Sequence, residues 1–261
     1  MRGRRNACLA VAVCLHVGAT GCKGGDSGSE GETERAEKSS RPAPTRQVDP
    51  ATAGSIEGTV SFSGTVPENP ELSIAEPACA KVHAGPVHQD QILVQAGKLQ
   101  NAFVYIKEGL ADYAFEPPAQ EVVIDQAGCV YQPLVVGVQV GQQLTFVNSD
   151  TVLHNVHTLA ENNRGANFSM PTRGMRTSRK FNKPEVMIRT KCDVHPWMRA
   201  FIGVVPHPHF AVTGADGAFR FQGVPPGEYV VELWHEKLGV QTLKVAVPEK
   251  GTARADFTVS P

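Results

Sequence analysis

Short runs of β-forming residues, separated by Gly, Pro, Asn and Asp, make up nearly all of this chain after residue 54. Examples are "SIEGTVSFSG", "NAFVYIKEG", "QEVVIDQAG" and "GEYVVELWHE". Several runs alternate apolar and polar residues with period two, as in "QLTFV" (143–147), and none keeps the period of an amphipathic helix. Short strands with frequent turn signals are typical of sandwiches, so we expect an all-β fold of the β-sandwich class.

The beginning of the chain, "MRGRRNACLAVAVCLHVGATGC", has an arginine-rich start and then an apolar stretch that is too short to span a bilayer. This is the layout of a secretory signal. Its end, "ATGC", resembles the lipobox of bacterial lipoproteins. The resemblance implies a signal peptide over 1–21, lipidation of Cys22, and an exported protein anchored on the periplasmic side of a bacterial membrane. The alternative is an ordinary secretory signal with an incidental Cys22.

Residues 22–54 contain no aromatic residue and very few large aliphatic ones. They cannot bury enough apolar area to offset the entropy of ordering, so we expect a disordered linker. The remaining residues suffice for one large or two small domains. A formal net charge of −1 without long basic blocks argues against nucleic acid as a partner, and no second apolar run is a candidate membrane span.

The chain has six cysteines, of which two lie in the expected signal and one is Cys22. The three that remain are Cys79, Cys129 and Cys192. Thiols of exported proteins tend to pair, and three is an odd number. Cys192 is the candidate for other work because a histidine and a methionine follow it at three-residue intervals in "CDVHPWM". If Cys192 is a metal ligand, Cys79 and Cys129 are free to form a disulfide.

Four side chains in two segments form a candidate metal-ligand set. His154 comes from "VNSDTVLHNVHTL", and Cys192, His195 and Met198 come from "CDVHPWM". A trigonal copper site takes two imidazoles and one thiolate, with a weak thioether as the fourth contact. Zinc is the competing metal, but it prefers a tetrahedral set without thioether. The alternative without metal is a structural cysteine beside incidental histidines.

The pattern Asn148-x5-His154 followed by Cys192-x2-His195-x2-Met198 resembles the small cupredoxins of the amicyanin and plastocyanin type, over about 119–206. The resemblance implies one type 1 copper, with His154, Cys192 and His195 as equatorial ligands and Met198 as the axial one. It also implies that Asn148 joins the two ligand loops by hydrogen bonds, and that the ring edge of His195 is the exit for the electron.

The segment "FAVTGADGAFRFQGVPPGEYVVELWHE" resembles the second half of a carboxypeptidase regulatory-like domain, a transthyretin-like sandwich. Its first half is expected earlier in the chain, where "GSIEGTVSFSG" and "KLQNAFVYIKEG" fit the pattern. We therefore expect the first part of this sandwich over 55–116, an inserted cupredoxin domain over 117–206, and the second part over 207–261. The alternative makes 55–206 one elaborated cupredoxin with an independent sandwich behind it.

These features predict a protein that carries single electrons between redox partner proteins through one copper. A metal held only by protein side chains has no open position for a substrate, so we expect no enzyme activity. Two alternatives remain: a periplasmic protein that binds or delivers copper, and a structural or interaction module in which copper is secondary.

Two other groups of residues are weaker candidates. Cys79, His83 and His88 form a possible second metal site, although their segment has the composition of a loop. His207 and His209 flank a proline at the expected domain junction, where we expect a solvated connector.

Overall fold

The computed structural model describes residues 44–261. The expected signal peptide, Cys22 and residues 22–43 of the linker lie outside the described residues. Almost every element in the described part is a strand, which confirms the all-β class, and α1 (Pro77–Ala80) is a single short helix. Within 44–261 no helix has the length and apolar character needed to cross a membrane.

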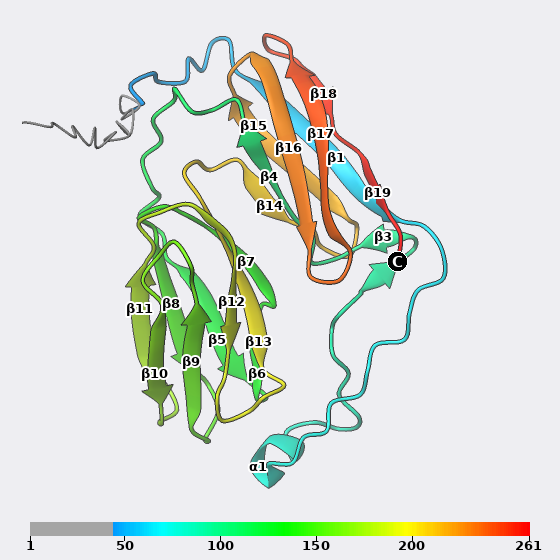
Figure 1. Cartoon of the computed structure of the whole chain (residues 1–261), viewed down its shortest axis with the longest axis vertical. Coiled ribbons are helices and arrows are strands. Elements are labelled where there is room, and N and C mark those ends of the chain that lie inside the picture. Colours follow the sequence, from blue (N-terminus) through cyan, green and yellow to red (C-terminus); the bar gives the residue numbers. More distant parts are fainter. Residues whose placement is uncertain (1–43) are drawn as a thin grey trace, which may run out of the picture. The chain divides into compact units, whose positions relative to one another are not determined.

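One sandwich, here called the flanking sandwich, uses strands from both ends of the described chain (Figure 1). Its strands are β1 (Gly54–Phe62), β2 (Val94–Gln95), β3 (Lys98–Leu99), β4 (Phe103–Glu108), β14 (Phe210–Val212), β15 (Ala218–Val224), β16 (Gly227–His235), β17 (Gly239–Val247), β18 (Thr252–Arg254) and β19 (Phe257–Val259). One sheet has the order β15-β1-β3-β2, with β18 and β19 also paired to β1, and the other has the order β14-β4-β16-β17. Strands before residue 109 thus pair with strands after residue 209.

The alternating sequences of this sandwich direct one set of side chains inward. In β1, Ile56 and Val60 are fully buried, and in β15 Phe219 and Phe221 turn to the same core while their neighbours face solvent. The period of two in the sequence therefore corresponds to one buried and one solvated face of these strands.

The residues between the two parts form a second sandwich, here called the inserted sandwich. Its strands are β5 (Val122–Ala127), β6 (Val130–Gln132), β7 (Val135–Gln139), β8 (Gln143–Asn148), β9 (His154–Leu159), β10 (Ala166–Met170), β11 (Arg176–Lys180), β12 (Glu185–Lys191) and β13 (Arg199–Val205). The sheet orders are β10-β9-β12-β13-β7 and β11-β8-β5-β6, with parallel pairs β13–β7 and β5–β8. Both sheets contribute to one core, which contains Ile124, Phe146 and Ile202.

Two glycines allow aromatic rings of the flanking sandwich to pack on the inserted one. Gly137 in β7 and Gly203 in β13 are paired in register. A Cβ atom at Gly137 would lie 2.3 Å from the ring of Phe210, and one at Gly203 would lie 2.5 Å from the ring of Phe103. Since real Cβ atoms do not approach so closely, these two positions require glycine.

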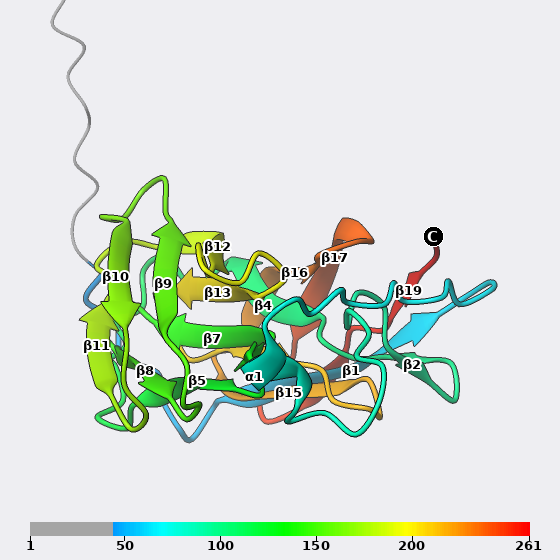
Figure 2. The same ribbon diagram turned by 90° about the horizontal axis from the view of Figure 1, so that it is seen from below.

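Residues 69–92 form a loop, here called the cap, that leaves the flanking sandwich after β1 and returns to it at β2 (Figure 1). Asn69 closes its base, because its side chain donates to the carbonyl of Ile92 and accepts from the amide of Ile92, both at 2.9 Å. The cap carries α1, which lies beside the strands of the inserted sandwich in Figure 2. A disulfide between Cys79 and Cys129 attaches α1 to the β5–β6 turn. Part of the 55–116 segment that the sequence associates with the flanking sandwich therefore contacts the inserted one.

Candidate metal centre

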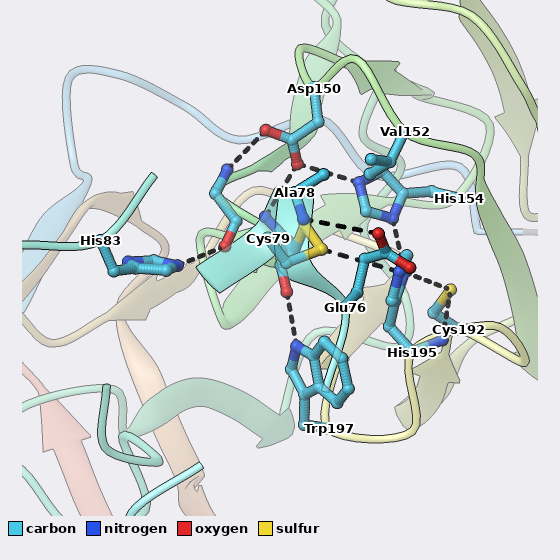
Figure 3. Close-up of a disulfide and its surroundings, with 12 residues drawn as sticks. Glu76, Ala78, Cys79, His83, Asp150, Val152, His154, Cys192, His195 and Trp197 are labelled. Carbon is cyan, nitrogen blue, oxygen red and sulfur yellow. Dashed lines mark hydrogen bonds and ion pairs between the residues drawn. A yellow bond between two sulfur atoms is a disulfide. The ribbon is translucent and has the colours of Figure 1, made fainter. Parts of the chain in front are cut away.

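Three of the four expected ligands, His154, Cys192 and His195, lie together at one end of the inserted sandwich (Figure 3). His154 is the first residue of β9, Cys192 directly follows β12, and His195 and Met198 lie in the loop that leads to β13. The Nδ1 atoms of His154 and His195 are 3.0 Å apart, and Sγ of Cys192 is 3.8 Å from Nδ1 of His195. All four residues are buried, and Met198 belongs to the same core cluster as Cys192.

Backbone hydrogen bonds fold the loop from Cys192 to Met198, here called the metal loop, into a tight turn. The amide of Met198 donates to the carbonyl of His195 at 3.0 Å, and the amide of Cys192 donates to the carbonyl of Met198 at 3.3 Å. The amide of His195 also donates to Sγ of Cys192 at 3.4 Å. The turn therefore holds Sγ of Cys192 next to the ring of His195.

The link between the two ligand segments comes from Asn155 and not from Asn148. Asn148 donates to the carbonyls of Val152 and Met170, at 3.0 and 2.8 Å, so these bonds connect its own loop to β10. The side chain of Asn155, next to His154, instead accepts from the amide of Asp193 at 2.7 Å. The bridging role that the resemblance implies for Asn148 is therefore corrected. Another asparagine, with a side chain directed toward the other loop, performs it.

Tyr131 adds a second link between the same segments. Its hydroxyl donates to the carbonyls of Asn155 and Lys191, at 2.5 and 3.2 Å, and so it contacts both β9 and β12 next to their ligands. The ring is buried in the core of the inserted sandwich. The sequence did not predict that Tyr131 links the two ligand segments, because a tyrosine is common in strands.

Asp150 contacts Nε2 of His154, the ring nitrogen that points away from the other donor atoms and is here called the outer nitrogen. Its Oδ2 lies 2.9 Å from Nε2 of His154, and its carboxylate also accepts from the amides of Gly128 and Cys129, each at 2.8 Å. A carboxylate at Nε2 keeps the proton on that nitrogen and leaves the lone pair of Nδ1 for a metal. Asp150 was not predictable as a site residue, because an aspartate in a loop four residues before a histidine carries no signal by itself.

The outer nitrogen of His195 has a different neighbour. Sγ of Cys79, in the disulfide, lies 3.7 Å from Nε2 of His195 (Figure 3). Trp197 closes the other side, since its ring centroid lies 5.1 Å from that of His195 and its Nε1 donates to the carbonyl of Cys129 at 2.9 Å. His195 is only 3 % exposed, so the ring edge expected to face a partner is covered.

Burial also favours the form of His195 that binds metal. Removal of the ring from water lowers the pKa of His195, and the nearby His154 lowers it further. A neutral imidazole has a free lone pair, whereas an imidazolium has none. Two nitrogens and a sulfur, with a thioether in the same buried core, are the donor set of a trigonal copper site, whereas zinc prefers a tetrahedral set without thioether. The residues present therefore fit a copper ion.

The weaker candidates do not form a further site of the kind expected. Cys79 is in the disulfide, Nε2 of His83 lies 2.8 Å from the carbonyl of Gly128, and Nδ1 of His88 lies 2.9 Å from the carbonyl of Asn69. Each of these two histidines therefore contacts a backbone carbonyl. No metal-ligand group among residues 44–261 contains either of them.

The expectation of a solvated connector at His207 and His209 is wrong, because both side chains are buried. Nε2 of His207 lies 2.8 Å from the carbonyl of Ile106, and the ring of Phe115 makes edge contacts with both histidines. Burial lowers the pKa of each to about 4. A proline between two histidines did not reveal that an aromatic ring from another segment covers them.

Comparison with known proteins gives only distant structural likenesses. No protein-family model matches the chain, and no curated protein matches it in sequence. A mutant of amicyanin in the Cu(I) state is 27 % identical over 32 % of this chain and 81 % of its own length, with a TM-score of 0.29. A purple cupredoxin from Nitrosopumilus maritimus is 26 % identical over 31 % of this chain and 97 % of its own, with a TM-score of 0.26.

A copper-containing nitrite reductase (NirK) from Thermus scotoductus SA-01 is 21 % identical, with a TM-score of 0.29. That match covers 56 % of this chain but only 28 % of the reductase. All these TM-scores are below 0.5, so we rest the assignment of the site on its donor atoms.

Proposed function

We propose that this chain is a mononuclear copper protein of the cupredoxin type that carries single electrons. The observation that supports this most directly is the meeting of two Nδ1 atoms and one Sγ atom in a buried space. Met198 in the same core offers the weak axial thioether that a type 1 copper site uses. Bound copper would supply a charge that changes by one between its two oxidation states.

The protein's own residues suit a carrier better than a catalyst. Asp150 and Asn155 fix the ligand segments through hydrogen bonds, and the turn from Cys192 to Met198 is closed by its own backbone. A geometry that changes little between oxidation states lowers the cost of gaining and losing an electron. Because the ligands come from side chains and the site is buried, a substrate has no place at the metal. We therefore propose that the protein is not an enzyme.

Export and anchoring belong to the same proposal. The signal-like residues 1–21 and the lipobox-like end at Cys22 support a lipid-anchored protein on the periplasmic side of a bacterial membrane. Its partners would be redox proteins of that compartment. Replacement of Cys22 by Ser should move the protein from the membrane fraction to the soluble fraction, and continued membrane association would reject the anchor.

Addition of copper(II) to the purified protein tests the site. We expect one equivalent to bind with an intense visible thiolate-to-copper absorption, and a reversible one-electron wave at an electrode. The variant Cys192→Ser should lose that absorption, because the thiolate is its origin. The matched control is Cys79→Ser with Cys129→Ser, which removes two sulfurs that are not proposed ligands and should keep the band.

The delivery alternative predicts a different result for the same sample. A protein that passes copper on should surrender copper(I) within minutes to a mild chelator and show no stable redox cycle. The buried site and the covering cap support retention of the metal, so we place electron transfer first.

A further inference from the structure

The two candidate histidine ligands differ at their outer nitrogens. Nε2 of His154 faces a carboxylate oxygen of Asp150 at 2.9 Å, as ligand histidines generally do. Nε2 of His195 is directed at Sγ of Cys79 at 3.7 Å, and within residues 44–261 no oxygen is a hydrogen-bond partner of this nitrogen. A disulfide sulfur is a weak acceptor, and a buried imidazole nitrogen usually finds water or an oxygen. The disulfide therefore stands where solvent or an oxygen acceptor is expected.

The contact is built by residues that are distant in the sequence. Cys79 lies on α1 of the cap, and Cys129 lies in the β5–β6 turn, where its carbonyl accepts from Nε1 of Trp197 at 2.9 Å. Both cysteines are buried, as is His195. Outside this contact, the cap and the metal loop border a cleft of about 630 Å³ that Glu71, Val194 and His195 itself help to line. His195 is nevertheless only 3 % exposed, so movement of α1 would widen the access from this cleft to its ring edge.

We propose that the Cys79–Cys129 disulfide seals the outer edge of His195 from water, exogenous ligands and copper chelators, without itself setting the geometry of the donor atoms. The biological use of this seal rests on the proposed electron transfer. The sealing itself is a property of the metal-free chain and can be tested without copper. An electron partner then approaches the cap and not a bare imidazole edge. Breaking the disulfide removes the covalent link between the cap and the inserted sandwich. The hydrogen bond of His83 to the carbonyl of Gly128 and the packing of Ile74 then remain, so opening becomes more frequent.

The test begins with metal-free protein, in which deuterium exchange at the ring carbon of each histidine reports access of water to that ring. His195 should exchange slowly in the oxidised protein and at least about tenfold faster in Cys79→Ser with Cys129→Ser, because local opening limits the exchange. His157 lies at the surface outside the cap and is the internal reference, which should not change. Unchanged exchange at His195 would overturn the proposal.

A second arm uses the native sequence, in case the double variant does not fold. An external dithiol reduces the disulfide to two thiols and is itself oxidised to a cyclic disulfide, so two electrons and two protons pass to Cys79 and Cys129. Reduced protein should show the same fast exchange at His195, and reoxidation should restore slow exchange. Slow exchange in the reduced protein would also reject the sealing role.

The third arm loads copper(I) and follows its capture by a soluble chelator. Capture should be at least about tenfold faster in the double variant than in the native protein, since a chelator must reach the metal through a local opening. Leu233→Ala is the matched control, because this side chain lies in the core of the flanking sandwich, whereas Cys79 and Cys129 lie in the core of the inserted one. Equal acceleration by Leu233→Ala would show that the effect is one of general stability and would contradict the proposal.

The arms separate this inference from the proposed function. If His195 becomes accessible but copper(II) gives no thiolate absorption, the sealing holds and the copper assignment fails. If the blue centre forms while deuterium exchange at His195 is the same with and without the disulfide, the copper assignment holds and the sealing role fails.

Discussion

The two sandwiches are built from similar strands but hold different kinds of interior. The flanking sandwich buries a cluster of apolar side chains, with Ile56 and Leu233 fully enclosed. The inserted sandwich has such a core as well, but one end of it holds His154, Cys192 and His195. An apolar core requires side chains that fill its volume and an alternating sequence that directs them inward. A buried cluster of metal-binding side chains also requires a hydrogen-bond partner for each polar atom that does not face the metal. The hydrogen bonds of Asp150 and Asn155 are the consequence of that difference.

We expect the largest difference between the two interiors from Leu233→Ala in the flanking sandwich, which should lower stability without changing the copper site. Loss of a fully buried leucine should lower the free energy of unfolding by about 2–5 kcal/mol, from lost apolar burial and the cavity left behind. The copper absorption should keep its position and intensity, because the side chain lies in the other core. Chemical denaturation and a visible spectrum of one sample check both. A displaced absorption band would show that the two interiors are coupled.

Acid should weaken the junction between the sandwiches through His207 and His209. The pKa of each is about 4 in the folded protein, below the ordinary value near 6.5, so the unfolded chain binds protons more readily. Their contribution is complete above about pH 6.5 and is lost as the pH falls toward 4, by on the order of 2–3 kcal/mol per imidazole at pH 4. Denaturant unfolding from pH 7 to pH 4 measures this loss.

The variant His209→Phe provides the control for that pH dependence. Nε2 of His209 has no hydrogen-bond partner within the described part of the chain, so its replacement leaves no partner unpaired. The decline in stability between pH 6.5 and 4 should become shallower. An identical slope would assign the acid sensitivity to other groups.

The outer partners of the donor cluster should matter more for the metal than for the fold. Asp150→Asn replaces the carboxylate at Nε2 of His154 and should weaken copper binding by about 10–100-fold, because the carboxylate orients the ring and raises its basicity. Asp193→Asn is the matched control in the metal loop, where the carboxylate faces His157 instead of a candidate ligand. Competition with a copper chelator measures both affinities. Equal losses would remove the special role of Asp150.

The smallest effect should come from an ion pair between the sandwiches. Arg199, at the start of β13, makes a two-pronged contact with Glu236, and both side chains are mostly buried. Arg199→Met should lower the free energy of unfolding by about 1.5 kcal/mol, since charged hydrogen bonds are lost while the apolar stem is kept and Lys237 stays 3.9 Å from the carboxylate of Glu236. Thermal unfolding with and without copper should show the same change. A larger change in the copper form would link this contact to the metal loop.

Much of this organisation follows from patterns over a few residues. Period two in "AFRFQ" corresponds to a strand with one buried face. In "QLTFV" the alternating Leu144 and Phe146 are buried, but Thr145 between them is buried too. The spacing of Cys192, His195 and Met198 places three donors in a single turn. Such features depend on local geometry, which the sequence specifies because neighbouring residues cannot lie far apart. The all-β class and the candidate ligand set were therefore predictable.

The surroundings of the donors were decided by the tertiary structure. Sγ of Cys79 meets the ring of His195 across 116 positions, and Trp197 meets Cys129 across 68. Nothing in local spacing distinguishes Asn155 from Asn148, or a covered His209 from a solvated one, until the path of the whole chain is known. The sequence alone specifies the strands, the unpaired cysteine and the kinds of side chain that could bind a metal. The tertiary structure sets which atoms contact each of these side chains, because those contacts join segments that are far apart in the sequence.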